Sequence, residues 1–299
     1  MVKKTIIKKL ENDMTCILSK TQCANTKRSA IIVMVKVGSI HEDEDNGEIG
    51  MAHFLEHVIL NGTRRRKNYY EIFNEIDKMG GEMNAHTTKD RTVFHITFPD
   101  MYFDQAMDIL SDCLFHTVMT DEKIEKEKSI VIEEENNIKN DLVDMTDNKL
   151  DNLMFKVHPL GRDPIGDKKS TMNFTLDGTR RFKNKFYRPD NMIISVCSKL
   201  SYNKVYKCID KYFGKYKNPN KKLCIKFPTE VLQKTPRIAI FKEYSRQYTL
   251  GVGFKTFGIE HEDIYILDVF NTLMGGIYGS ILFMDLREKN ELVYSVDSN

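Results

Sequence analysis

The sequence contains no run of eighteen consecutive apolar residues, so it predicts no helix long enough to cross a bilayer. Its first residues, MVKKTII, lack both the apolar core of a secretory signal peptide and the arginine-rich pattern of a transit peptide. We therefore expect neither membrane insertion nor secretion, and we predict a cytoplasmic protein.

The chain has six cysteines, but no pair of them has the C-x-x-C spacing typical of structural zinc sites and redox motifs. This usage is typical of reduced thiols in an intracellular protein rather than of a disulfide framework. An excess of charge is also absent, because the formal net charge is +2. The basic run 64–67 predicts a solvated loop rather than a nucleic-acid-binding patch, so we expect no nucleic-acid partner.

The sequence does contain a short motif, HFLEH, at residues 53–57. Residues four apart lie on one face of a helix, so His53 and His57 can bind one cation while Glu56 stays within reach of the same point. The order H-x-x-E-H is the signature of inverted zinc peptidases, in which the carboxylate is the general base and not a ligand. Composition alone would produce the motif in about one such chain in 70, so two half-exposed histidines beside a solvated glutamate remain an alternative.

A catalytic zinc site usually has three protein ligands, so the chain must supply another donor. The acidic segment 120–138 predicts a helix, with Thr120 as its N-cap and with Glu127 and Glu134 on one stripe. Two helical turns separate these glutamates by about 10 Å, so we expect one to bind the ion and the other to orient a ligand. The alternative is a solvated, charged helix face.

These motifs resemble those of the pitrilysin and insulin-degrading zinc peptidases, especially the shorter members related to the mitochondrial processing peptidase. In that family a liganding glutamate follows the H-x-x-E-H motif after about 76 residues, and 76 residues separate His57 from Glu134 here. The family also has a glutamate seven residues before the ligand, which corresponds to Glu127. The resemblance implies one zinc ion per chain, bound by His53, His57 and Glu134. It also implies that Glu127 supports the site and that Glu56 is the base.

The segment GGEMNAHT at residues 80–87 resembles the family's G-G-x-x-N-A-x-T segment, an edge strand that pairs with bound substrate. The resemblance implies that Asn84, Ala85 and Thr87 bind substrate. Alternating apolar residues at 91–98 predict a neighbouring strand. Addition of a substrate strand would supply affinity through backbone hydrogen bonds.

Other histidines and glycines add no further site. We interpret His86 and His95 as structural or strand-surface histidines, because the metal already has three donors. The glycines at positions 275, 276 and 279 match neither the G-x-x-x-x-G-K-[ST] nor the G-x-G-x-x-G phosphate-binding pattern. They therefore predict a turn.

Residues 268–276 and 286–296 also resemble the family, in which an arginine and a tyrosine lie seven residues apart. Arg287 and Tyr294 have this spacing. The resemblance implies that the tyrosine hydroxyl stabilises the oxyanion while the arginine contacts the substrate backbone. The alternative is an ordinary helix-end arginine and a half-buried tyrosine. In the family these residues reach the zinc from the opposite half of a clamshell, which implies a homodimer or a partner half.

The patterns together predict an α+β fold of metallohydrolase-type lobes, each with helices packed on an antiparallel-dominated sheet. Residues 1–220 are expected to form the zinc-binding catalytic lobe, 221–235 a linker, and 236–299 part of a second lobe of related fold. Strands are expected at 237–242 and 248–254. Short family members run on by about a hundred residues, so we expect this second lobe to be incomplete, as in a fragment or a natural short form.

These observations predict a zinc-dependent endopeptidase that hydrolyses short, unfolded or presequence-like peptides, with Glu56 activating the zinc-bound water. One alternative is a non-catalytic scaffold subunit of the same fold, although such subunits usually lack motif residues. Another alternative is a non-peptidase hydrolase built on the same inverted motif.

Overall fold

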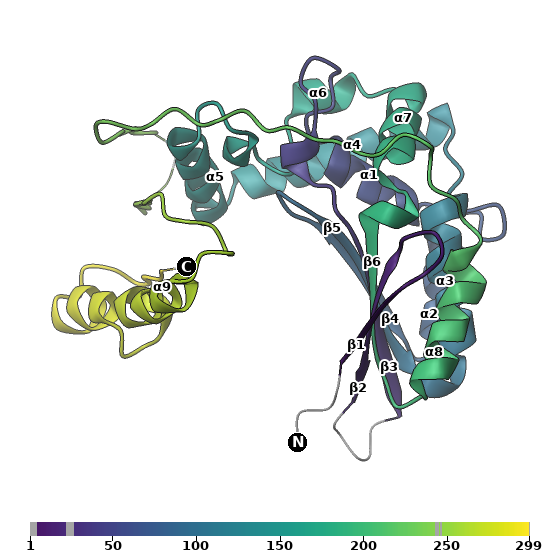
Figure 1. The fold of residues 1–299 in the computed structure, drawn as a ribbon. Helices are drawn as coiled ribbons and strands as arrows, with labels where there is room; N and C mark the ends of the chain where they lie inside the picture. Colours follow the sequence, from purple (N-terminus) through teal and green to yellow (C-terminus); the bar gives the residue numbers. More distant parts are fainter. Residues whose placement is uncertain (1–4, 22–26, 243–244, 246, 299) are drawn as a thin grey trace. The chain divides into compact units, whose positions relative to one another are not determined.

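The computed structural model describes residues 5–21, 27–242, 245 and 247–298. The chain divides into two units, Met1–Val252 and Gly253–Asn299, which we treat one at a time. The H-x-x-E-H motif lies in the first unit, on helix α1 (Figure 1). Of the six cysteines, Cys23 lies outside the described residues, and five are free thiols: Cys16, Cys113, Cys197, Cys208 and Cys224.

A six-stranded sheet forms the centre of the first unit, in the order β1-β2-β6-β3-β5-β4. Its strands are β1 (Ile6–Lys9), β2 (Thr15–Lys20), β3 (Arg28–Val35), β4 (Glu82–Thr87), β5 (Thr92–Pro99) and β6 (Met192–Ser198). All neighbouring strands are antiparallel except β2 and β6. The predicted α+β fold with a mostly antiparallel sheet is therefore confirmed.

The helices described in the first unit are α1 (Met51–Leu60), α2 (Tyr69–Lys78), α3 (Phe103–His116), α4 (Asp121–Lys139), α5 (Leu142–Met154), α6 (Lys168–Met172), α7 (Leu176–Phe186) and α8 (Tyr202–Ile209). Of these, α1, α2, α3 and α8 pack on one face of the sheet (Figure 1). Helices α4 and α7 contact α1, and α5 and α6 contact α4. Among the described helices, none has both the length and the apolar character needed to cross a bilayer.

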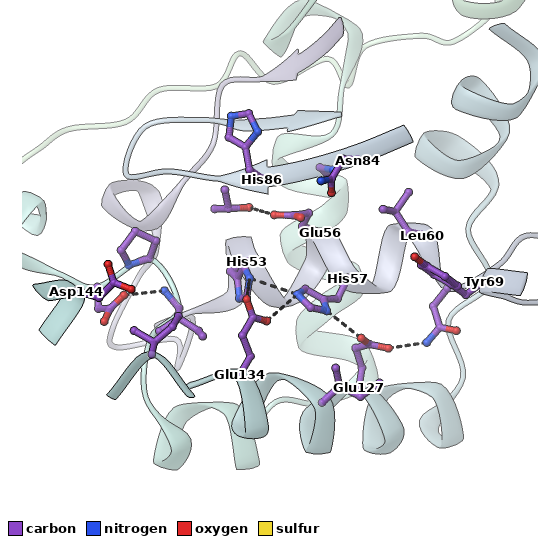
Figure 2. A pocket seen from close by; sticks show the side chains of 18 of the residues that line it. His53, Glu56, His57, Leu60, Tyr69, Asn84, His86, Glu127, Glu134 and Asp144 are labelled. Carbon is purple, nitrogen blue, oxygen red and sulfur yellow. Dashed lines mark hydrogen bonds and ion pairs between the residues drawn. The ribbon is translucent and has the colours of Figure 1, made fainter. Parts of the chain in front are cut away.

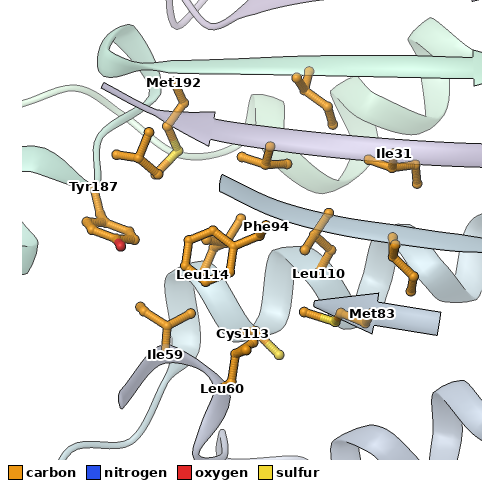
Figure 3. Packing of buried hydrophobic residues seen from close by; sticks show 14 of the residues in the cluster. Ile31, Ile59, Leu60, Met83, Phe94, Leu110, Cys113, Leu114, Tyr187 and Met192 are labelled. Carbon is orange, nitrogen blue, oxygen red and sulfur yellow. The ribbon is translucent and has the colours of Figure 1, made fainter. Parts of the chain in front are cut away.

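The hydrophobic core lies between the helices and the sheet. Along β3, Ile31 and Val33 are fully buried whereas Ile32 between them is 40% exposed, because alternate side chains of a strand point to opposite faces. Phe94 of β5 lies beside Leu114 of α3 in this core (Figure 3). The packed face of the sheet therefore fixes where α1 and α3 sit.

A buried carboxylate holds the N-terminus of α1. Glu42 accepts hydrogen bonds from the backbone N–H groups of Gly50 (2.8 Å) and Ala52 (2.9 Å), where a negative charge is favoured. Burial raises the pKa of Glu42 to about 8, although these two N–H groups act in the opposite direction. Gly50 has φ of 83°, and a Cβ there would lie 2.6 Å from the Ile165 carbonyl oxygen, so only glycine fits.

The basic run 64–67 is exposed at Arg64, Arg65 and Lys67, as predicted for a solvated loop, but its third residue, Arg66, is buried. Arg66 is 6% exposed and donates hydrogen bonds to Asp112 (2.9 Å), Asp108 (2.9 Å) and Glu75 (3.0 Å). The aspartates come from α3 and the glutamate from α2, so packing of these helices surrounds the loop with carboxylates. These ion pairs depend on residues distant in sequence, so the run alone did not reveal that Arg66 is buried.

The second unit contains α9 (Ile264–Asn271), followed by helical turns at Thr272–Gly276 and Phe283–Lys289.

The prediction of strands at 237–242 and 248–254 is wrong, because both ranges lack regular secondary structure. Ile238 and Ile240 are 85% and 86% exposed. A strand needs the backbone groups of a neighbouring strand, and alternating apolar residues do not supply that partner.

Candidate metal centre

Two histidines of α1 and a glutamate of α4 converge in a cleft of the first unit (Figure 2). Nε2 of His57 lies 3.3 Å from Nε2 of His53 and 3.2 Å from Oε2 of Glu134. Nε2 of His53 lies 3.6 Å from Oε1 of Glu134. In the part of the chain that the structure describes, these residues form the one cluster of at least three potential metal-binding His, Cys, Asp or Glu side chains.

Glu127 fixes the orientation of one of these histidines. Its Oε1 lies 3.1 Å from Nδ1 of His57, and its Oε2 accepts a hydrogen bond from the Asn61 amide at 2.6 Å. A carboxylate can only accept, so His57 donates through Nδ1, and Nε2, which faces His53 and Glu134, is the nitrogen left to bind a metal once it loses its proton. This is the tautomer that a metal ligand needs.

The pKa of His57 indicates a site that attracts a cation, because neighbouring carboxylates raise it. Burial alone would lower the pKa of His57, but hydrogen bonds with Glu127 and Glu134 outweigh it and raise this pKa to about 10. Burial, and then the neighbouring His57, lower the pKa of His53 to about 4. A divalent cation can replace the proton held here, because metal ligands must be deprotonated. Two imidazole nitrogens and one carboxylate oxygen also form a donor set that suits zinc.

Glu56 lies outside the ligand cluster but borders the same cleft (Figure 2). Its side chain is 7% exposed, and its Oε2 accepts the hydroxyl proton of Thr87 at 2.6 Å. Burial raises the pKa of Glu56, against the opposite effect of the Thr87 hydrogen bond. A carboxyl group with a raised pKa beside a metal site can both take and return a proton.

Strand β4 forms one wall of the cleft and is an edge strand of the sheet. Asn84, Ala85 and Thr87, which the sequence assigns to substrate, all lie along this wall. The Asn84 side chain accepts the backbone N–H of Ala85 at 2.8 Å, whereas the Thr87 hydroxyl faces Glu56. The polar side chains of Asn84 and Thr87 thus have different partners, a difference that the family segment does not reveal.

The cleft has a volume of about 1030 Å³, and its lining differs in chemistry on the two sides of the histidines, with Tyr69 on one side and Asp144 on the other (Figure 2). One side is apolar and includes the rings of Tyr69 and Phe73, which are stacked with their centroids 3.9 Å apart. The other side is acidic and is formed by Asp144, Asp147 and Asp163. The sequence analysis missed these lining residues, because no local pattern marks them.

Arg287 and Tyr294 lie in the second unit. The guanidinium carbon of Arg287 is 5.5 Å from the ring centroid of Tyr294 and 5.0 Å from that of Phe283. The structure therefore brings the predicted arginine and tyrosine close to each other. Their role at a zinc centre stays a prediction, because each unit is described by itself.

Comparison with known proteins identifies the family. Residues 18–168 match the family model described as insulinase (peptidase family M16), and residues 173–299 match the peptidase M16 inactive domain. The chain belongs to peptidase family M16. The resemblance that the H-x-x-E-H motif indicates is thus confirmed at the level of this family.

Several known proteins match most of this chain. An uncharacterized zinc protease of Bacillus subtilis, YmxG, is 34% identical over 269 residues, which cover 90% of this chain and 64% of that protein. An uncharacterized zinc protease of Rickettsia felis is 28% identical over 293 residues, which cover 98% of this chain and 69% of that protein. A protease structure from Helicobacter pylori has a TM-score of 0.92 at 25% identity and covers 100% of this chain and 72% of its own. The chain spans about two thirds of the length of these proteins.

Proposed function

We propose that this M16 chain is a zinc-dependent endopeptidase with one Zn2+ held by His53, His57 and Glu134. The observation that carries the proposal is the convergence of these three donors, with Glu127 holding His57 in the tautomer that a ligand needs. Three protein ligands leave one coordination position open, as catalytic zinc sites require. When bound, zinc polarises the scissile carbonyl and lowers the pKa of the attacking water.

Glu56 performs the proton transfers. It takes a proton from the water as the water oxygen forms a bond to the carbonyl carbon. It then gives that proton to the amine nitrogen as the C–N bond breaks, which restores the carboxylate. No side chain becomes bonded to the substrate, so no covalent acyl-enzyme forms.

The cleft supports short or unfolded peptides as substrates. An extended peptide can add to the free edge of β4, where the backbone around Asn84 and Ala85 supplies affinity. The apolar side of the cleft suits an apolar or aromatic side chain, and the acidic side suits a basic one. This chemistry supports the more specific expectation of presequence-like peptides.

A second half completes the proposed enzyme. Tyr294 stabilises the oxyanion and Arg287 contacts the substrate backbone, each supplied by a second copy or a partner half in a clamshell. Both residues lie within the range 173–299 that matches the peptidase M16 inactive domain. We propose the short, processing-peptidase-like subgroup, with residues 1–220 as the catalytic lobe, 221–235 as the linker and 236–299 as part of the second lobe.

The test is the variant Glu56→Gln, assayed by mass spectrometry on a peptide library. We expect loss of cleavage with zinc content near that of the wild type, because Glu56 is a base and not a ligand. Glu133→Gln removes the same charge from an exposed position on α4 and should leave cleavage unchanged. Full activity in Glu56→Gln would reject the mechanism. A wild type that contains no stoichiometric zinc and cleaves no peptide would favour the scaffold alternative.

A further inference from the structure

We infer that Thr87 is a positioning residue for Glu56: its hydroxyl holds one carboxylate oxygen and leaves the other to exchange a proton with water. The inference rests on the proposed function, because it assumes that Glu56 is the base. It assigns the Thr87 side chain to catalysis rather than to substrate binding.

Thr87 is the last residue of β4, and its side chain lies on the face of the strand that packs toward α1. Burial alternates along β4, with Met83, Ala85 and Thr87 less exposed than the residues between them. The hydroxyl of Thr87 therefore reaches Oε2 of Glu56, at 2.6 Å. The contact joins the cleft's edge strand to the helix that carries both histidines.

A second threonine is a more distant acceptor for the Thr87 proton than Glu56 is. Thr92 of β5 lies opposite Thr87 in the register, and the two hydroxyl oxygens are 3.4 Å apart. Thr92 is fully buried and donates its own proton to the Val37 carbonyl oxygen at 2.9 Å. A hydroxyl has a single proton and a carboxylate can only accept, so the Thr87 proton points to Glu56.

The two carboxylate oxygens of Glu56 therefore have different roles. Oε2 is occupied by Thr87, so Oε1 is the oxygen that remains for the proton of the attacking water. A base fixed at one oxygen cannot rotate freely about its terminal bond. Catalysis is sensitive to such placement, since a shift of about 1 Å at a reacting group can cost about 100-fold in rate.

The experiment compares three variants of the full chain loaded with zinc. Thr87→Val keeps the shape of the side chain but removes the hydroxyl, and Thr87→Ser keeps the hydroxyl. Thr88→Val is the matched control, because its hydroxyl bonds only within the β4–β5 turn, to Asp90 and the Arg91 carbonyl. The measured quantities are kcat and KM on one peptide that the wild type cleaves, together with zinc content.

We expect kcat of Thr87→Val to fall about 10- to 100-fold while KM stays within about twofold. Thr87→Ser should recover most of the lost kcat, and Thr88→Val should match the wild type. A rise in KM at constant kcat would overturn the inference, because it would make Thr87 a substrate contact. Unchanged kinetics in Thr87→Val would overturn it as well.

Crystal structures of Thr87→Val and Thr87→Ser provide a readout that does not depend on activity. We expect Glu56 to change its side-chain conformation in the valine variant and to keep it in the serine variant. An unmoved Glu56 in Thr87→Val would refute the positioning role. If Glu56→Gln retained activity, the proposed function would fail, and the structures would still decide whether Thr87 orients this carboxylate.

Discussion

Replacing Glu127 by glutamine should weaken zinc binding without removing a ligand. The Glu127 carboxylate accepts from His57 through one oxygen and from Asn61 through the other. A glutamine amide has one acceptor oxygen and one donor nitrogen, so it can satisfy only one of these two donors. Either His57 loses its partner or the Asn61 amide faces another N–H donor, and the negative charge behind His57 is lost in both cases.

The expected magnitude follows from the place of Glu127 behind a ligand. Loss of a partner that orients a metal-bound histidine costs about 10- to 100-fold in metal affinity, or about 1.4 to 2.7 kcal/mol. The assay is competition for zinc against a chelator of known affinity at fixed pH. Because Glu127 is 5% exposed, salt should screen the effect only weakly.

The matched control is again Glu133→Gln, which removes one negative charge from the same helix at an exposed position. It should change zinc affinity much less than Glu127→Gln does. Equal affinities in Glu127→Gln and the wild type would contradict the argument that Glu127 orients His57. Equal losses in the two variants would indicate that only the overall charge of α4 matters.

Two further predictions concern folding stability, measured by urea unfolding. The folded-state pKa of Glu42 is raised from 4.5 to about 8, so the stability it contributes is full below pH 4.5 and is lost as pH rises towards 8. Glu42→Gln should therefore flatten the decline in unfolding free energy over this range, and a slope equal to that of the wild type would contradict the assignment. Arg66→Met should cost about 1 to 3 kcal/mol, because Asp112 would lose one buried partner while it keeps Arg65, His116 and Thr63. Arg64→Met, at an exposed position, should cost less than about 0.5 kcal/mol, and similar losses in both would refute the role of the buried ion pairs.

Local spacing allowed much of the metal cluster to be predicted from the sequence. His53 and His57 meet because one turn of helix brings them to the same face, and the same geometry places Glu127 and Glu134 on one stripe of α4. Helical geometry could not decide which glutamate faces the two histidines, and the long spacing shared with the family supplied that choice. Alternating strands and amphipathic helices similarly indicated the α+β class.

Tertiary packing decided the features that local patterns leave undetermined. The bond from Thr87 to Glu56 and the buried partners of Arg66 join segments that lie far apart in the sequence. The exposed ranges 237–242 and 248–254 illustrate the converse, because their apolar alternation suggested strands that do not form. The sequence therefore determined which side chains share a face of one helix or strand. The structure alone decided which faces meet, since hydrogen bonds, ion pairs and strand pairing need a partner that another part of the chain must supply.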